Sequence, residues 1–283
     1  MIQRLAKAKV NLALHVIGQR GDGYHRIDTL AGFADVGDRL TFERSTNSEI
    51  SLNLAGPFAG DLTQQGNIVL KAAGLLAEAA DSKAGAAITL EKNLPVASGI
   101  GGGSADAAAT LDGLRDLWEL ADQFPLKTLA AKLGADVAMC LVSAPLRATG
   151  IGEIVEPLHR ARTFNALLVN PGVAMATPQV FTALASKTNP PIGELPENPF
   201  DPVFLAGLRN DLEAPARMLL PTIGEVLAAI ANQKGCLLAR MSGSGATCFG
   251  LFGSAEDTRA AHEAIVDKAP HWWSVPTEIG GTD

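Results

Sequence analysis

The feature that most constrains this chain is a glycine-rich segment from Leu94 to Asp106, Leu-Pro-Val-Ala-Ser-Gly-Ile-Gly-Gly-Gly-Ser-Ala-Asp. A weak strand pattern over 85–92 precedes it, and a helical pattern follows it with Ser104 as the expected N-cap. Glycines let consecutive backbone N–H groups converge, and a helix start adds partial positive charge. The segment therefore predicts a phosphate-binding loop between a strand and a helix.

Glycine spacing excludes two other phosphate-binding motifs. No Lys-Ser or Lys-Thr pair follows the glycines, and no G-x-G-x-x-G can be read from Gly99 or Gly101. A flexible strand–helix turn is the alternative, but four glycines within five residues exceed what a turn needs. Asp106 has two interpretations, of which we favour the first: it complements the helix dipole, or it lies near a Mg²⁺ that accompanies the phosphates.

A second glycine cluster, Met-Ser-Gly-Ser-Gly-Ala-Thr over 241–247, separates strand patterns at 237–241 and 247–252. A tight hairpin is the simpler interpretation of this arrangement. The other is that Gly243 and Ser244 lend N–H donors to a substrate phosphate.

Other polar residues carry weaker signals. Alternation over 9–17 predicts a strand with Lys9 and Asn11 on one face. The loop 18–26 contains the only tyrosine, Tyr24, beside His25, a pair that suits either a surface turn or stacking on a nucleobase. Asp136 follows Gly134, a glycine expected in the left-handed conformation after a helix over 125–133, and by itself indicates only a cap.

Composition narrows the class of protein. The net charge of −7 argues against a nucleic-acid-binding surface, and 47% hydrophobic residues are enough for a sizeable core. The three cysteines form no CxxC pair, which argues against a disulfide framework or structural zinc. No apolar run is long enough for a membrane helix. We therefore expect a soluble cytoplasmic protein.

Strand and helix patterns alternate without a strict βαβα order, which predicts an α+β fold. A proline-rich loop over 189–202 is a candidate cover for a site. Further predictions are a helix over 67–80 and strands at 40–42, 50–54 and 164–169. We also predict a helix with Thr177 as its N-cap and Pro178 as its first residue, and a capping box from Asn210 to Glu213.

Taken together, these segments resemble the GHMP small-molecule kinases. Ala8–Leu12, Pro95–Ala107 and Ser242–Gly245 are similar to the three motifs of that family. The resemblance is collinear from Ala6 to about Phe252. Three further segments are similar to the branch that acts on a cytidine diphosphate-linked methylerythritol: Gly18–His25, Gly134–Val137 and Asn210–Glu213.

The resemblance implies a fold and a reaction. The expected fold has a ribosomal-S5-like N-terminal domain over 1–155 and a ferredoxin-like C-terminal domain over 156–283, with the site in the cleft between them. ATP, with Mg²⁺, would phosphorylate the 2-hydroxyl of the methylerythritol unit, a step of the non-mevalonate route to isoprenoids. We expect a monomer or weak homodimer that binds this small molecule and neither nucleic acid nor membrane.

Residue roles follow from the same resemblance. The implied catalytic residues are Lys9 and Asp136. The implied nucleotide-binding residues are Pro95, Val96, Ala97, Ser98, Gly99, Ile100, Gly101, Gly102, Gly103, Ser104, Ala105, Asn67 and Lys92. The implied substrate-binding residues are Asn11, Tyr24, His25, Thr177, Phe181, Gly243 and Ser244.

One position departs from the family pattern, and two other functions stay open. Ala105 stands where the family commonly has a second serine, which puts the ligation of Mg²⁺ by this loop in question. The alternatives are another kinase of the superfamily, acting on homoserine, mevalonate or a sugar, and a nucleotide sensor without catalysis. Retention of both Lys9 and Asp136 argues against the sensor.

Overall fold

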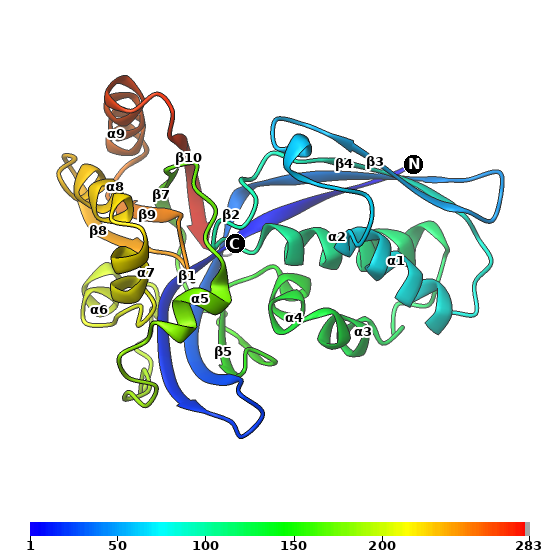
Figure 1. The fold of residues 1–283 in the computed structure, drawn as a ribbon, viewed down its shortest axis with the longest axis horizontal. Coiled ribbons are helices and arrows are strands. Elements are labelled where there is room, and N and C mark those ends of the chain that lie inside the picture. The colour runs from blue at the N-terminus through cyan, green and yellow to red at the C-terminus, as the bar shows by residue number, and fades with distance from the viewer. Residues whose placement is uncertain (281–283) are drawn as a thin grey trace. The chain divides into compact units, whose positions relative to one another are not determined.

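The computed structural model describes residues 1–280 and divides the chain into two compact units built from separated segments. Unit 1 comprises 1–8, 36–96 and 101–143, and unit 2 comprises 9–35, 97–100 and the described chain from 144 onward. The long strands β1 (Ile2–Gln19) and β2 (His25–Arg44) each contribute residues to both units (Figure 1). The boundary expected near residue 155 stays a prediction.

Unit 1 is a small sheet covered by helices. The second half of β2 pairs antiparallel with β4 (Ala86–Glu91), which pairs parallel with β3 (Ile50–Ala55). Helices α1 to α4 lie on one face of these strands (Figure 1). The short helix η1 and these four helices span Ala59–Asp61, Ile68–Ala79, Gly102–Leu117, Leu126–Leu133 and Ala135–Val142.

The contact between α2 and this sheet is close because a glycine allows it. A Cβ at Gly113 would lie 2.4 Å from the ring of the fully buried Phe42 on β2. Any larger side chain on this face of α2 would push the helix away from the sheet. Gly113 therefore sets the distance between α2 and these strands.

Unit 2 is built on antiparallel strands. Strand β7 (Phe164–Asn170) pairs with β9 (Cys248–Phe252) and β10 (Trp273–Gly280), and β9 also pairs with β8 (Cys236–Met241). The first half of β2 pairs with the end of β10 and with β5, and β5 pairs with β6. The remaining elements are β5 Leu146–Gly150, β6 Ile154–Pro157, α5 Thr177–Thr182, α6 Pro202–Ala206, α7 Glu213–Leu219, α8 Thr222–Ala231 and α9 Ala255–Lys268.

The apolar core of unit 2 joins these strands to the helices that cover them. Val169 from β7 and Phe252 from β9 pack in one cluster with Val226 and Ile230 of α8 and Ile265 of α9. Burial of such side chains contributes about 1.5–3 kcal/mol each, so this cluster holds the hairpin of β8 and β9 in place.

Most of the expected elements are confirmed. The strands near 50, 86, 164, 237 and 248 and the helices over 67–80 and 125–133 form within a few residues of their predicted bounds. The strands predicted at 9–17 and 40–42 also form, but they are much longer than predicted, because β1 begins at Ile2 and β2 at His25. Asn67 is the N-cap of α1, because its Oδ1 accepts the N–H of Val69 at 2.9 Å. Residues 189–201 form no helix or strand, as predicted. None of the described helices has the length and apolarity to span a membrane.

Two of the predicted helix caps are wrong. Helix α2 begins at Gly102 and its N-cap is Gly101, with φ 66°, so Ser104 lies inside the first turn. Glycine adopts this left-handed conformation without steric cost, which lets the helix start earlier than a serine cap would. The N-cap of α5 is Ala176 and not Thr177, although Pro178 stands at the helix start as expected.

The capping box predicted from Asn210 to Glu213 is also wrong. The N-cap of α7 is Leu212, and no side chain caps it. The Oδ1 of Asn210 accepts the N–H of Leu212 at 3.0 Å, and its Nδ2 donates to the carbonyl oxygens of Met241 and Gly243, both at 2.8 Å. Glu213 Oε2 accepts the N–H of Met241 at 3.1 Å. Both residues therefore fix the second glycine cluster, because long-range partners were available for side chains that the local pattern assigned to a helix end.

Candidate active site

The middle of the first glycine segment, 97–100, contacts strand β1 and the second glycine cluster within unit 2. The N–H of Lys9 donates to the carbonyl of Ile100 at 2.9 Å, and the N–H of Thr247 donates to that of Ser98 at 3.0 Å. Gly99 has φ 78°, and a Cβ there would lie 2.6 Å from the carbonyl oxygen of Ser242. The backbones approach so closely that only glycine fits at this position.

The hydroxyl of Ser242 links three segments that are far apart in the sequence. Its Oγ accepts the N–H of Asn11 at 3.0 Å and donates to the carbonyl of Gly99 at 3.0 Å. The serine is fully buried. Because one hydroxyl serves as both acceptor and donor, the first strand, the glycine loop and the second glycine cluster meet at one atom. The sequence indicated the cluster but gave no special role to this serine.

Lys9 and Asn11 lie on the same face of β1, as their alternation predicted. Nζ of Lys9 donates to Oδ1 of Asn11 at 2.9 Å, and both residues are 2% exposed. Nδ2 of Asn11 donates to Oγ1 of Thr29 at 2.8 Å, and this hydroxyl donates to the carbonyl of Ala13 at 2.6 Å. The chain of bonds fixes the asparagine amide with its oxygen toward the lysine. Sequence patterns gave no signal for Thr29.

The second glycine cluster connects the antiparallel strands β8 and β9, so the predicted hairpin forms, but its connection over 242–247 is longer than the tight turn expected. It packs directly on the first glycine segment, since a Cβ at Gly243 would lie 2.8 Å from the carbonyl oxygen of Gly99. The hydroxyls of Ser244 and Thr177 are 2.8 Å apart. This cluster therefore supports the first loop, and its contact with a substrate phosphate stays a prediction.

Two of the three rings expected around a nucleobase lie together. The rings of His25 and Phe181 stack with centroids 4.7 Å apart and an interplanar angle of 21°. Nε2 of His25 is buried without a hydrogen-bond partner. Burial, followed by the positive charge of Lys187, lowers the pKa of His25, which keeps the ring neutral at pH 7. Tyr24 is 61% exposed.

Asp136 and Asn67 lie in unit 1. Asp136 stands in the first turn of α4, a helix that the sequence patterns missed. Gly134, which ends α3 and precedes α4, has φ 154° and ψ 155°, so it is extended with positive φ and does not adopt the left-handed helical conformation expected for it. The oxygen of the Asn67 amide is engaged at the start of α1.

Lys92 and Asp106 form ion pairs in unit 1. Nζ of Lys92 lies 2.5 Å from Oδ2 of Asp38 and 2.6 Å from Oδ2 of Asp106, and all three side chains are almost fully buried. Asp106 lies beyond the first turn of α2 and pairs with a lysine, so the favoured interpretation of it as a complement to the helix dipole is wrong. Asp38, a third member of this cluster, carried no sequence signal.

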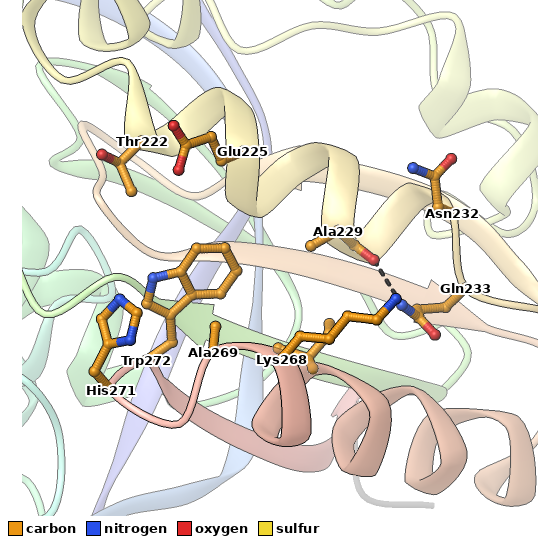
Figure 2. Close-up of a pocket in the computed structure, with 10 residues that line it drawn as sticks. Thr222, Glu225, Ala229, Asn232, Gln233, Lys268, Ala269, His271 and Trp272 are labelled. Atoms are coloured by element: carbon orange, nitrogen blue, oxygen red, sulfur yellow. Dashed lines mark hydrogen bonds between the residues drawn. The ribbon is translucent and has the colours of Figure 1, made fainter.

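Two observations bear on metals and other ligands. Among residues 1–280, no group of three or more His, Cys, Asp or Glu side chains could hold a metal ion. A pocket of about 500 Å³ lies between α8 and α9 and is lined by Glu225, Lys268 and Trp272 among others (Figure 2). None of the residues expected to bind nucleotide or substrate lines this pocket.

Family models match two parts of the chain. The GHMP kinases N terminal domain matches residues 67–144, and the GHMP kinases C terminal domain matches residues 202–272. Together with the mixed α and β architecture, these matches define the class as the GHMP kinases and confirm the fold class expected from the sequence. A solved structure of homoserine kinase from Cytophaga hutchinsonii, 19% identical with a TM-score of 0.75 over 99% of this chain and 94% of that one, shares the fold.

More similar relatives narrow the class. A 4-diphosphocytidyl-2-C-methyl-D-erythritol kinase from Cereibacter sphaeroides is 52% identical over 99% of this chain and 100% of its own length. One from Paramagnetospirillum magneticum is 48% identical over 97% of each chain. A solved structure of 4-(cytidine 5'-diphospho)-2C-methyl-D-erythritol kinase is 34% identical, with a TM-score of 0.80 over 99% of this chain and 100% of that one. The chain belongs to this family of kinases.

Proposed function

We propose that this protein transfers the γ-phosphoryl group of ATP to the 2-hydroxyl of 4-diphosphocytidyl-2-C-methyl-D-erythritol, a step of the non-mevalonate route to isoprenoid precursors. Its relatives bear the name of that kinase. The observation that carries the proposal is the Ser242 hydroxyl, which joins the lysine-bearing strand to both glycine segments. Phosphoryl transfer depends mainly on the positioning of the reacting groups and on preorganised charge. The bonds of the Ser242 hydroxyl hold the strand and the two glycine segments in fixed positions.

Phosphate binding falls to the first glycine segment in this proposal. Backbone N–H groups after Gly101, at the start of α2, offer donors and partial positive charge to the phosphates of ATP. Pro95 to Ala105 supply the walls of the loop and Asn67 lies toward the adenine, while the ammonium group of Lys92 is paired with Asp38 and Asp106. These assignments rest on the resemblance of the motif and on the position of α2 behind it.

The reacting groups are supplied by a lysine and an aspartate. Asp136 accepts the proton of the substrate hydroxyl, late in a loose transition state. Lys9 places positive charge next to the transferring group, and Asn11, whose amide is fixed by Thr29, orients the acceptor. The buried position of Lys9 strengthens its field, because water screens a buried charge less.

The residues near the loop do not form a magnesium site by themselves. Ala105 brings no hydroxyl, and the carboxylate of Asp106 already accepts from Lys92. We infer that Mg²⁺ arrives on the phosphates of ATP and is held mainly by them. When bound, the ion neutralises phosphate charge.

Recognition of the cytidine falls to the aromatic residues of unit 2. Phe181 offers a ring face, Tyr24 an exposed ring, and the neutral His25 a nitrogen for the polar edge of the base, with Thr177 nearby. Stacking of a base on an aromatic side chain contributes about 1–3 kcal/mol. Tyr24→Ala should therefore raise KM for the cytidine substrate about tenfold. An unchanged KM would instead favour a kinase for homoserine, mevalonate or a sugar.

The direct test is a product assay. The protein is incubated with ATP, Mg²⁺ and the diphosphocytidyl alcohol, and phosphorus NMR should show a new phosphomonoester. Asp136→Ala should abolish turnover while the fold and nucleotide binding persist. Near-normal turnover in this variant would contradict the proposed kinase reaction. Nucleotide binding without any phosphomonoester from the unaltered protein would favour the sensor. Parallel reactions with homoserine, mevalonate and galactose should give no product.

We also propose that the protein works in the cytoplasm as a monomer or weak homodimer and binds no nucleic acid or membrane. Its acidic balance, −7 at pH 7, supports the exclusion of nucleic acid. Sedimentation at micromolar and millimolar concentration should show a predominant monomer at the lower one.

A further inference from the structure

The buried charges of unit 1 form a compact cluster of Asp38, Lys92 and Asp106, which we call the buried charge cluster. Their side chains are 0%, 3% and 3% exposed. Two carboxylates share one ammonium group, and Oδ1 of Asp106 is buried without a hydrogen-bond partner. Burying such a group costs free energy, so the cluster is an unusual feature for a region that has only to be stable.

Asp38 fixes the chain just before the glycine loop. Its Oδ1 accepts two backbone N–H groups, that of Asn93 at 2.6 Å and that of Leu94 at 2.8 Å. Its Oδ2 accepts from Lys92. Since Pro95 follows directly, these bonds set the direction in which the chain enters the loop.

Asp106 connects the same lysine to the other end of the loop. It lies in α2, five residues beyond the N-cap Gly101, and its Oδ2 accepts from Nζ of Lys92. The ammonium lies under the helix start, because a Cβ at Gly102 would be only 3.2 Å from Nζ. Through these bonds Lys92 links the residues that precede the loop to the helix that follows it, and all of these residues belong to unit 1.

The lysine itself is also held at its backbone. The N–H of Lys92 donates to the carbonyl of Ala55 at 2.7 Å, and its carbonyl accepts from Phe58 at 3.2 Å. Burial, together with the nearby charge of Asp38, raises the pKa of Asp106 to about 7, although the positive charge of Lys92 acts in the opposite direction. The three charged groups of the cluster therefore interact strongly, and the backbone of the lysine among them is fixed.

We propose that Asp38, Lys92 and Asp106 are positioning residues for the glycine loop: they hold its two ends at the spacing at which its N–H groups meet the phosphates of ATP. This inference rests on the proposed function. It assigns the charge of Lys92 to the carboxylates of the cluster and not to the nucleotide. It also explains why a carboxylate stands so close behind a loop that binds anions, since the lysine masks it.

The test compares variants by their separate KM values. Asp38→Ala should raise KM for ATP about tenfold to a hundredfold, the size expected when a supporting group is lost, and leave KM for the alcohol within about twofold. Kd for a non-hydrolysable ATP analogue should rise by the same factor. Asp38→Asn should restore most of the affinity, because its amide oxygen still accepts the N–H groups of Asn93 and Leu94.

A matched control comes from the same helix. Asp112 also pairs with two cations, Arg4 and Arg115, but its side chain is 33% exposed. Asp112→Ala should leave both KM values unchanged. If Asp38→Ala does not fold, Asp106→Ala serves instead, since it leaves the neutral pair of Lys92 and Asp38 in place and should also weaken ATP binding.

Three results separate the possibilities. A variant with a lower melting temperature but unchanged KM for ATP overturns the positioning role, and so does an equal rise in both KM values. Failure of the unaltered protein to bind the ATP analogue overturns the proposed function instead. A rise confined to ATP, reversed by Asp38→Asn, supports the inference.

Discussion

Two buried lysines, one in each unit, have different partners. Lys92 in unit 1 contacts two carboxylates, whereas within unit 2 Lys9 donates to the amide oxygen of Asn11. Both are 2% exposed. A carboxylate neutralises the charge of an ammonium group, while an amide oxygen orients the group through a hydrogen bond. Burial alone therefore does not distinguish the two lysines: the ion pairs of Lys92 hold residues of unit 1 together, whereas the proposed function places Lys9 at the reacting groups.

The largest effect is expected on substitution of Lys92. Lys92→Met would leave the carboxylates of Asp38 and Asp106 buried without their cation, which should cost about 3–5 kcal/mol of the free energy of unfolding. Urea unfolding followed by circular dichroism measures the loss. A loss below about 1 kcal/mol, typical of an exposed pair, would contradict the assignment of a buried charge cluster.

Lys9 is tested by the rate of the reaction, because the proposed function places its charge next to the transferring group. Lys9→Ala should lower kcat by about 10²–10³, or about 2.7–4 kcal/mol of transition-state stabilisation, as for one preorganised donor. Steady-state kinetics on the diphosphocytidyl alcohol measures this. A rise in KM by a similar factor, with kcat unchanged, would mean that Lys9 stabilises the bound substrate and the transition state equally.

The stability of the protein should depend on pH through the buried charge cluster. Asp106 has a pKa of about 7 in the native protein against an ordinary value of 3.8, so between these values the native state holds a proton that the unfolded state has released. Stability should therefore fall as pH rises from about 4.5 to 7, by at most about 1.4 kcal/mol per pH unit. Urea midpoints at pH 5, 6 and 7 measure the slope.

Asp106→Asn is the control for this pH effect. Asparagine keeps the size of the side chain and an oxygen for Lys92, but it does not titrate in this range. The variant should lose the part of the slope that Asp106 contributes. An identical slope in both proteins would show that another group causes it.

The smallest effect is expected from the partly exposed ion pairs of α2. Asp112→Asn removes a carboxylate that contacts Arg4 and Arg115 at the surface, and stability should change by about 0.2–1 kcal/mol at most. Thermal unfolding at low and high salt measures it, and salt should reduce the difference. A loss as large as that of Lys92→Met would remove the distinction between buried and exposed ion pairs on this helix.

Much of this architecture was accessible from local patterns. Alternation placed Lys9 and Asn11 on one face, and Asn67 proved to be an N-cap, since both depend on neighbours within a few residues. The same local rules failed for Asn210 and Glu213, whose side chains reach backbone groups about 30 residues away. A polar side chain serves a local cap or a distant backbone equally well, and only packing decides between them.

Residue types at short spacing were enough to predict the glycine loop, several of the strands and helices, and the family to which the chain belongs. Only the tertiary structure decided that Ser242 joins three segments, that Thr29 orients Asn11, and that Asp38 and Asp106 share Lys92. Each of these contacts joins residues 14 or more positions apart, with the single hydroxyl of Ser242 spanning from Asn11 to residue 242. Burial makes such polar contacts obligatory, since an unpaired polar group in the core is costly, but which partners meet depends on the path of the whole chain.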